Sequence, residues 1–136
     1  MPTTIIGPFS GEFRFLSNFW VDKDGFCVEK HYQASKTNDP EWKQRILNAK
    51  TPGEAKRLGR SAPIRPDWES VKLPEMEGFL RHKFSRSPLR EQLLDTYPHQ
   101  LVELNTWGDF FWGVCRGMGK NHLGRLLMKI REEATQ

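Results

Sequence analysis

Three sites where a helix-capping residue precedes a proline constrain the fold of this sequence more than any other feature. Aspartate, serine and threonine side chains accept hydrogen bonds from the free N–H groups at the start of a helix. Proline suits the first helical position, because the N–H that it lacks would have no partner there. The pairs are Asp39-Pro40, Thr51-Pro52 and Ser87-Pro88. They predict three helix starts, so much of the middle of the chain should be helical.

The second of these starts carries the strongest signal. Glu54 lies three residues after Thr51, which completes a capping box in which the glutamate reaches back to the cap. We expect this helix to end near Gly59, since glycine is common just beyond a helix C-terminus. Two further helices are predicted, one from Trp68 onward and one after Asn121 as its N-cap, each with a recurring apolar face.

The helix after Trp68 contains Pro74, which removes a backbone hydrogen bond and clashes with the preceding turn. We therefore expect a kink, or two consecutive helices that meet near Leu73. A basic run follows and is expected to be exposed to solvent. It consists of Arg81, His82, Lys83 and Arg86.

A smaller β portion is predicted near the N-terminus. Residues 9–20, rich in aromatics, and the apolar segment 26–28 flank Asp24-Gly25, and this pattern is typical of an antiparallel hairpin. Residues 101–104 predict another brief strand. These features together predict a mainly α protein with a small N-terminal β-hairpin, of the α+β class. A length of 136 residues fits one compact domain, spanning residues 1–136.

Composition narrows the classes of function. The net charge of +4 and the isoelectric point near 9.2 suit phosphorylated or nucleic-acid ligands, although many proteins that bind neither are as basic. No apolar run approaches the ~18 residues that span a bilayer, so no membrane-integral segment is expected. Cys27 and Cys115 form no CxxC motif and no secretory leader precedes them, which favours a reducing cytoplasm. The four histidines match no metal-ligand spacing, so no metal is expected.

The segment 28–36 places four functional groups on one face of a helix. Glu29, Tyr32, Gln33 and Lys36 follow one another at i, i+3, i+4 and i+7, which brings a carboxylate, a phenol, an amide and an amine together. Two interpretations stay open at this point. Such a face is either solvated, with an ordinary i,i+4 pair, or it is a reactive surface.

Two glycine-flanked segments near the C-terminus also carry candidate groups. Asp109 lies among four aromatic residues in the segment 107–113, where a buried carboxylate is costly unless it is partnered. It should therefore be tied to hydrogen-bond donors or kept for chemistry. The segment 117–121 leads into the last helix, whose first N–H groups either are simply capped or hold a phosphate.

In order along the chain, these motifs resemble the NADAR, or YbiA-like, family, and the match covers nearly the whole sequence. The motifs are residues 13–19; Glu29 with Tyr32-Gln33-Ala34 and Lys36; Glu54-Ala55-Lys56 with Leu58-Gly59-Arg60; Trp68 with Lys72 and Met76; Asp109 with Phe111-Trp112-Gly113; and Asn121 with Leu123-Gly124. The resemblance implies a mostly helical domain with N-glycosidase activity on phosphoribosyl or ADP-ribosyl N-glycosides. Two branches of the family are expected: cleavage of early riboflavin-pathway intermediates, and removal of ADP-ribose from guanine in DNA or RNA.

The resemblance also implies the site residues. Glu29, Lys36 and Asp109 are the catalytic candidates, and no cofactor is implied. Many relatives carry histidine directly after the glutamate, whereas this chain has Lys30 there, so Lys30 and His31 are not assigned to the site. The expected substrate-binding residues are Arg14, Ser17, Asn18, Phe19, Tyr32, Gln33, Lys56, Gly59, Arg60, Trp68, Lys72, Trp107, Trp112, Gly113 and Asn121.

These residue types suit cleavage of a ribosyl C1–N bond, which develops positive charge on C1 and the ring oxygen. A carboxylate stabilises that charge while an acid assists the leaving base, and Glu29 and Asp109 could divide these roles. Lys36 either attacks C1 of the ring-opened sugar as a Schiff-base nucleophile, or only orients the ligand. An amine on the same face as a carboxylate favours the covalent role. The alternative function is a non-catalytic module that reads ADP-ribose or nucleic acid through the same aromatics and cations.

Overall fold

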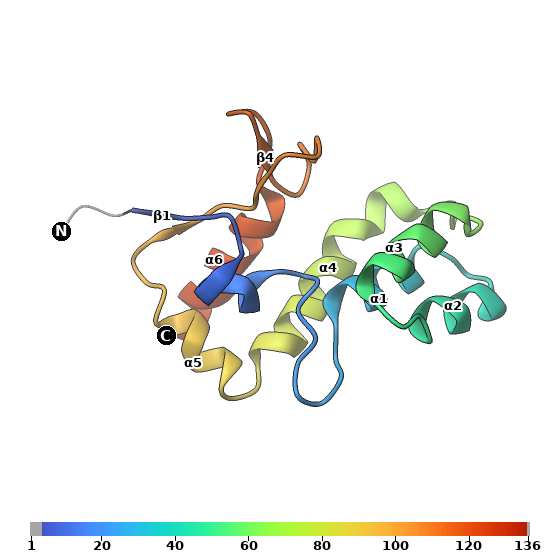
Figure 1. Cartoon of the computed structure of the whole chain (residues 1–136), viewed down its shortest axis with the longest axis horizontal. Helices are drawn as coiled ribbons and strands as arrows, with labels where there is room; N and C mark the ends of the chain where they lie inside the picture. The colour runs from blue at the N-terminus through green and yellow to red at the C-terminus, as the bar shows by residue number, and fades with distance from the viewer. Residues whose placement is uncertain (1–3, 136) are drawn as a thin grey trace. The chain divides into compact units, whose positions relative to one another are not determined.

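The computed structural model describes residues 4–135, and these group into two compact units (Figure 1). The helical unit is the continuous segment Asn18–Lys83. The terminal unit combines the chain up to Ser17 with the chain from Phe84 onward. The predicted fold class, mainly α with a small β portion, is confirmed. None of the helices in residues 4–135 has both the length and the apolar character needed to cross a membrane.

Four helices build the helical unit: α1 (Val28–Ser35), α2 (Pro40–Leu47), α3 (Pro52–Ser61) and α4 (Trp68–Phe84), whose last residue is counted with the terminal unit. The first three pack against one another, as Figure 1 shows, around a cluster of buried residues on all three and the loop between α2 and α3. The cluster consists of Ala34, Ile46, Ala49 and Ala55. Burying these apolar side chains stabilises the three-helix arrangement.

Two of the three predicted helix starts are confirmed. Asp39 caps α2 by accepting hydrogen bonds from the N–H groups of Glu41 and Trp42. Thr51 caps α3 by accepting from the Glu54 N–H at 3.1 Å. Glu54 reaches back as expected, but to the N–H of Lys50, one residue before the cap.

The third predicted start is displaced by one residue. Helix α5 (Leu89–Leu94) begins after Pro88, which occupies the N-cap position itself. Ser87 does not cap the helix, because its hydroxyl donates instead to the Glu91 carboxylate at 2.6 Å.

Helix α3 does not end at Gly59 but continues to Ser61. Gly59 is buried inside the helix, where the absence of a side chain lets α3 approach α1 closely. Helix α4 is also more continuous than predicted, since it runs through Pro74 without a break. Pro74 has no N–H to donate to the Ser70 carbonyl, four residues earlier. Both residues are exposed, so water can hydrogen-bond to that carbonyl instead.

The prediction that the whole basic run after α4's midpoint is solvated is wrong for Lys83, which is only 1% exposed. Lys83 follows Leu80 by three residues and Met76 by seven, so it falls on the buried face of the same helix. Burial lowers the pKa of Lys83 to about 7, and nearby Cys27 and Asp22 act in the opposite direction.

The terminal unit contains two short parallel strand pairs and helix α6 (His122–Ala134). Strand β1 (Ile5–Ile6) pairs with β2 (Gln100–Leu101), and β3 (Leu104–Asn105) pairs with β4 (Val114–Cys115). The brief strand predicted at residues 101–104 is therefore divided between two separate pairs. Helix α6 packs on β2 and α5 through a buried stripe, in agreement with the predicted apolar face.

The predicted N-terminal hairpin survives only as one antiparallel bridge, between Val21 and Cys27 around the expected turn. Residues Gly11–Leu16 form a short 3-10 helix, η1, where a strand was predicted. Its consecutive residues Phe15 and Leu16 are both buried, which a strand with alternating faces would not allow. The aromatic residues of this segment therefore follow helical rather than strand geometry.

Candidate active site

The polar face of α1 is buried, so it is not the solvated face that spacing alone allowed. Glu29, Tyr32 and Gln33 are 7%, 8% and 5% exposed. The backbone N–H of Glu29 donates to the Asn18 carbonyl at 2.9 Å, which attaches the start of α1 to the preceding loop. A carboxylate that is buried in this way is kept in a protein only when donors satisfy it.

Gln33 is one such donor for Glu29. One helical turn separates the two residues, and the Gln33 Nε2 donates to the Glu29 Oε1 at 2.8 Å. This contact links the expected catalytic carboxylate to a second residue of the predicted site. It also fixes the side-chain direction of Glu29, because both groups are held on one rigid helix.

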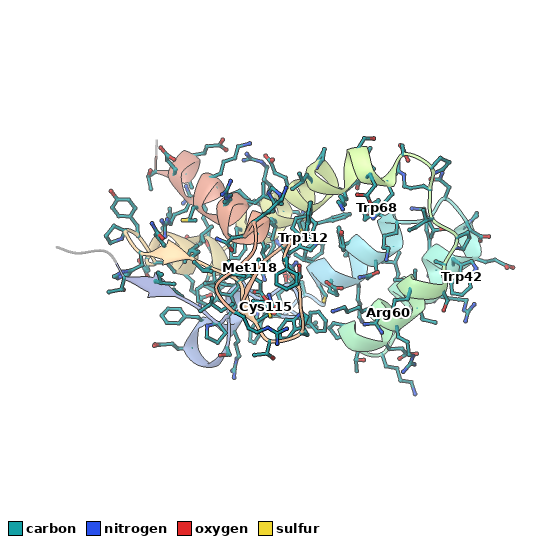
Figure 2. The ribbon with its side chains drawn as sticks, turned by 90° about the horizontal axis from the view of Figure 1, so that it is seen from above. Trp42, Arg60, Trp68, Trp112, Cys115 and Met118 are labelled. Carbon is teal, nitrogen blue, oxygen red and sulfur yellow. The ribbon has the colours of Figure 1, made fainter. Side chains whose placement is uncertain are left out.

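Lys36 follows at the C-cap of α1 and is half-buried. Burial lowers the pKa of Lys36, the charge of Glu29 raises it, and the charges of Arg60 and Lys56 lower it further. The Lys36 amine therefore lies within electrostatic range of the carboxylate on its own helix and of two cations on α3. Figure 2 shows Arg60 on α3. We call Lys36, Lys56 and Arg60 the cation cluster.

Aromatic side chains accompany these charges in the helical unit. The Tyr32 ring lies 5.2 Å from the ring of Trp68, which begins α4 and is labelled in Figure 2. The Lys56 amine lies 5.9 Å from the centre of the Phe19 ring, a cation–π distance, and Phe19 is 42% exposed. Such rings suit stacking against a base or exclusion of water from a reacting sugar.

Two further predicted residues of this unit have specific surroundings. Asn18 is buried; its Nδ2 donates to the Met76 sulfur at 3.6 Å, while its Oδ1 accepts no hydrogen bond from the described residues. Lys72 forms an ion pair with Glu69 at 2.8 Å, one helical turn away on α4.

In the terminal unit, Asp109 is half-buried and shapes a turn. Its Oδ1 accepts from the N–H groups of Phe111 and Trp112, at 3.2 and 2.9 Å. Its own backbone is held by Asn105, whose amide accepts from the Asp109 N–H and donates to the Asp109 carbonyl. The other carboxylate oxygen of Asp109, Oδ2, accepts no hydrogen bond within residues 4–135. Asp109 is therefore compatible with both predicted roles: Oδ1 is tied to hydrogen-bond donors, and Oδ2 is left for chemistry.

At the start of α6, the first two backbone N–H groups already have hydrogen-bond partners. The N–H groups of His122 and Leu123 donate to the carbonyls of Phe111 and Trp112, at 3.1 and 3.0 Å. Asn121 stands at the N-cap position but does not cap the helix with its side chain. That side chain accepts from the Glu103 N–H and donates to the Leu101 carbonyl, so it holds the strand region to the helix.

The remaining predicted residues of the terminal unit differ widely in exposure. Trp107 is 63% exposed, whereas Trp112 is half-buried, with its ring edge-on to the Phe111 ring at 4.8 Å. Gly113 is buried, and a side chain there would collide with the Glu103 carbonyl, so this glycine is needed for packing. Arg14 is exposed and Ser17 is half-buried.

The structure thus gathers the predicted residues into two sets. The helical unit holds Glu29 and Lys36 together with Asn18, Phe19, Tyr32, Gln33, Lys56, Gly59, Arg60, Trp68 and Lys72. The terminal unit holds Asp109 together with Arg14, Ser17, Trp107, Trp112, Gly113 and Asn121. Asn105, which anchors the Asp109 turn, was not predicted. Its position four residues before Asp109 is a local signal that could have indicated it, since asparagine side chains often organise turns.

The helical unit thus carries a buried carboxylate on α1 together with the cation cluster of α1 and α3. The model of the NADAR domain matches residues 9–135, so the chain belongs to the NADAR family.

Named relatives share this family over different lengths. The chain is 41% identical over 145 residues to the N-glycosidase YbiA of Escherichia coli (strain K12), covering 98% of this chain and 90% of that protein. It is 37% identical over 132 residues to the riboflavin biosynthesis protein VVA0006 of Vibrio vulnificus (strain YJ016), covering 90% of this chain and 36% of that protein. The NMR structure of the E. coli protein YbiA superimposes with a TM-score of 0.85 at 39% identity, over 99% of this chain and 87% of that one.

Proposed function

We propose that the chain is an N-glycosidase that cleaves the ribosyl C1–N bond of a phosphorylated N-glycoside. The observation that carries this proposal is the buried Glu29 carboxylate, held by Gln33 at 2.8 Å on the same helix as Lys36. The name of the E. coli relative, N-glycosidase YbiA, supports the same type of reaction.

The chemistry follows from these groups. As the C1–N bond breaks, positive charge develops on C1 and the ring oxygen, and a fixed carboxylate stabilises it. Glu29 is suited to this role, because its direction is set by a rigid helix and its surroundings exclude most of the water. Lys56 and Arg60 of the cation cluster offer positive charge to the phosphate of the substrate. Asp109, in the terminal unit, is proposed as a further catalytic carboxylate, with its Oδ2 as the oxygen that the turn does not use.

The substrate that we propose is a phosphoribosylaminopyrimidine intermediate of riboflavin synthesis. Relatives named as riboflavin biosynthesis proteins, from Vibrio vulnificus and maize, support this branch. ADP-ribosylated guanine, in DNA or RNA, is the other substrate class, and it shares the ribosyl C1–N bond and the phosphates.

A parallel incubation tests the function and the branch together. The protein is mixed with the phosphoribosylaminopyrimidine and, separately, with DNA that carries ADP-ribosylated guanine, and the released base and sugar phosphate are measured by mass spectrometry. We expect release from the pyrimidine and loss of that release in Glu29→Gln. Binding of either ligand without any release would instead support the non-catalytic module, because a reader of ADP-ribose or nucleic acid needs no turnover.

A further inference from the structure

The Gln33 side chain is satisfied at only one of its two ends. Its Nε2 donates to Glu29, whereas its Oε1 is buried and accepts no hydrogen bond from any residue that the structure describes. A buried carbonyl without a donor costs free energy, and an apolar side chain of the same shape would avoid that cost. Stability alone therefore does not account for an amide at this position.

Gly59 provides the space that this amide occupies. A Cβ atom at position 59 would collide with the Gln33 Oε1 and would lie 2.9 Å from its Cδ. Glycine inside a helix weakens that helix relative to alanine, so its presence within α3 needs a packing reason. Gly53, in the first turn of the same helix, shows the contrast, because a Cβ there would meet nothing closer than the Thr51 Oγ1 at 3.9 Å.

We propose that Gln33 is a positioning residue that keeps Glu29 ionised and fixed in direction, and that Gly59 holds the Gln33 amide in place by leaving room for it. The proposal rests on the proposed N-glycosidase function and assigns the role of each residue within it. A donor aimed at a carboxylate favours the charged form. Glu29 is then the carboxylate that stabilises positive charge on C1, and it is not the proton donor to the leaving base. Gln33 acts through Glu29 and does not bind substrate.

The first test replaces Gln33 with methionine, which keeps the length of the side chain and removes the donor. We expect kcat at neutral pH to fall at least about tenfold, with KM within about threefold of the wild type. We also expect the acidic limb of the pH–rate profile to move up by about one to two pH units, the size of a lost hydrogen bond to a charged group. A raised KM with kcat retained would make Gln33 a substrate contact and overturn the proposal.

A second readout needs no turnover and separates this proposal from the proposed function. Glu29 is titrated by carbon-13 NMR of its carboxyl group in the folded wild type and in Gln33→Met. We expect the midpoint of the Glu29 titration to be about one to two pH units higher in the variant. An unchanged midpoint overturns the positioning role. A shifted midpoint in a protein that cleaves no N-riboside supports the positioning role and rejects the function.

The third test addresses Gly59. We expect Gly59→Ala to lower kcat and to raise the Glu29 midpoint as Gln33→Met does, while the matched control Gly53→Ala leaves both unchanged. Gln33→Ala leaves space for the new Cβ atom. Adding Gly59→Ala to that variant should therefore lower kcat little further, so the effects of the two substitutions should be non-additive. If Gly59→Ala alone does not fold, the double variant should fold again. The role of Gly59 is overturned if Gly59→Ala keeps the wild-type kcat and Glu29 midpoint. It is also overturned if the losses of kcat in the two single variants simply add in the double variant, or if the double variant stays unfolded.

Discussion

The two oxygens of the Asp109 carboxylate have different surroundings, and substitutions can separate their roles. Oδ1 accepts from two backbone N–H groups and stabilises a turn, whereas Oδ2 is available. Asp109→Asn keeps an acceptor for the turn and removes the charge, so we expect kcat to fall by about a hundredfold or more with little change in Tm. Kinetics and thermal unfolding on the same samples check this result.

The matched substitution Asp109→Ala removes the acceptor as well as the charge. It should lower the free energy of unfolding by about 1–3 kcal/mol, because the two N–H groups lose their charged partner. If Asp109→Asn instead lost stability and kept its activity per folded molecule, Asp109 would have only a structural role.

Lys36 can act as a nucleophile only as the neutral amine. Burial lowers the pKa of Lys36, which increases the neutral fraction near neutral pH, and the charge of Glu29 opposes this effect. We expect borohydride, added during turnover, to reduce an imine and leave the mass of the sugar on Lys36. The adduct should be absent in Lys36→Arg, since arginine keeps the charge and cannot form the imine.

A different pair of results would assign Lys36 to ligand orientation alone. These are the absence of an adduct during active turnover, and a Lys36→Arg rate within about tenfold of the wild type, which is ~1.4 kcal/mol in the barrier.

Lys83 makes stability depend on pH. Burial lowers the pKa of Lys83 to about 7 in the folded protein, against roughly 10.4 in an unfolded chain. Between these values the unfolded state binds more protons, so stability rises with pH; below pH 7 both states are protonated and the cost of burying the charge is complete. From pH 7 to 8.5, the free energy of unfolding should rise relative to Lys83→Met by up to about 1.4 kcal/mol per pH unit. Urea unfolding of both proteins at several pH values measures this difference. Parallel pH curves for the two proteins would contradict it.

At the scale of single elements, the caps of α2 and α3 can be tested directly. The side chains of Asp39 and Thr51 accept hydrogen bonds from backbone N–H groups that would otherwise lack a helical partner. We expect Asp39→Ala and Thr51→Ala each to lower the free energy of unfolding by about 1 kcal/mol. Ser87→Ala is the comparison. Because Ser87 does not cap α5, this variant should lose less free energy of unfolding. Denaturant unfolding of the three variants ranks them, and an equal loss in all three would contradict the assignment of the caps.

The same elements show why part of the fold could be predicted and part could not. The caps of α2 and α3 depend on residues within one turn, so the local sequence contains the whole signal. Gly59 resembles a helix stop in the sequence, but its role is a contact with Gln33 on another helix, which no local pattern encodes. Lys83 was misassigned for a similar reason, since a lysine is normally exposed and only the packing of α4 buries it.

The site itself was predictable to a similar extent. Spacing brought Glu29, Gln33 and Lys36 to one face, and the structure confirms that Glu29 and Gln33 are in contact. Spacing could not show that this face is buried, because that depends on the loop before α1 and on α3 packing against it. The role of Asn121 was hidden in the same way, since its partners lie some twenty residues earlier in the chain.

At the scale of the whole molecule, the net charge of +4 bears on substrate binding. If exposed cations such as Arg60 hold the substrate phosphate, ions in solution screen that attraction. We expect KM to rise between about 50 and 200 mM salt, and to rise more steeply for a DNA-borne substrate, which also displaces counterions. A dephosphorylated N-riboside is the control and should show a weaker dependence. A KM that does not change with salt for the phosphorylated substrate would contradict the phosphate assignment.

The pairing of β1 with β2 also has a consequence for how the chain emerges from the ribosome. Ile5 pairs with Gln100, so the terminal unit cannot close until the ribosome has synthesised strand β2. The helical unit is one continuous segment, so all of it can be synthesised and fold before β2 exists. The growing chain should therefore acquire its Glu29 helix early, while strand β1 remains unpaired and open to association with other chains until β2 has been synthesised.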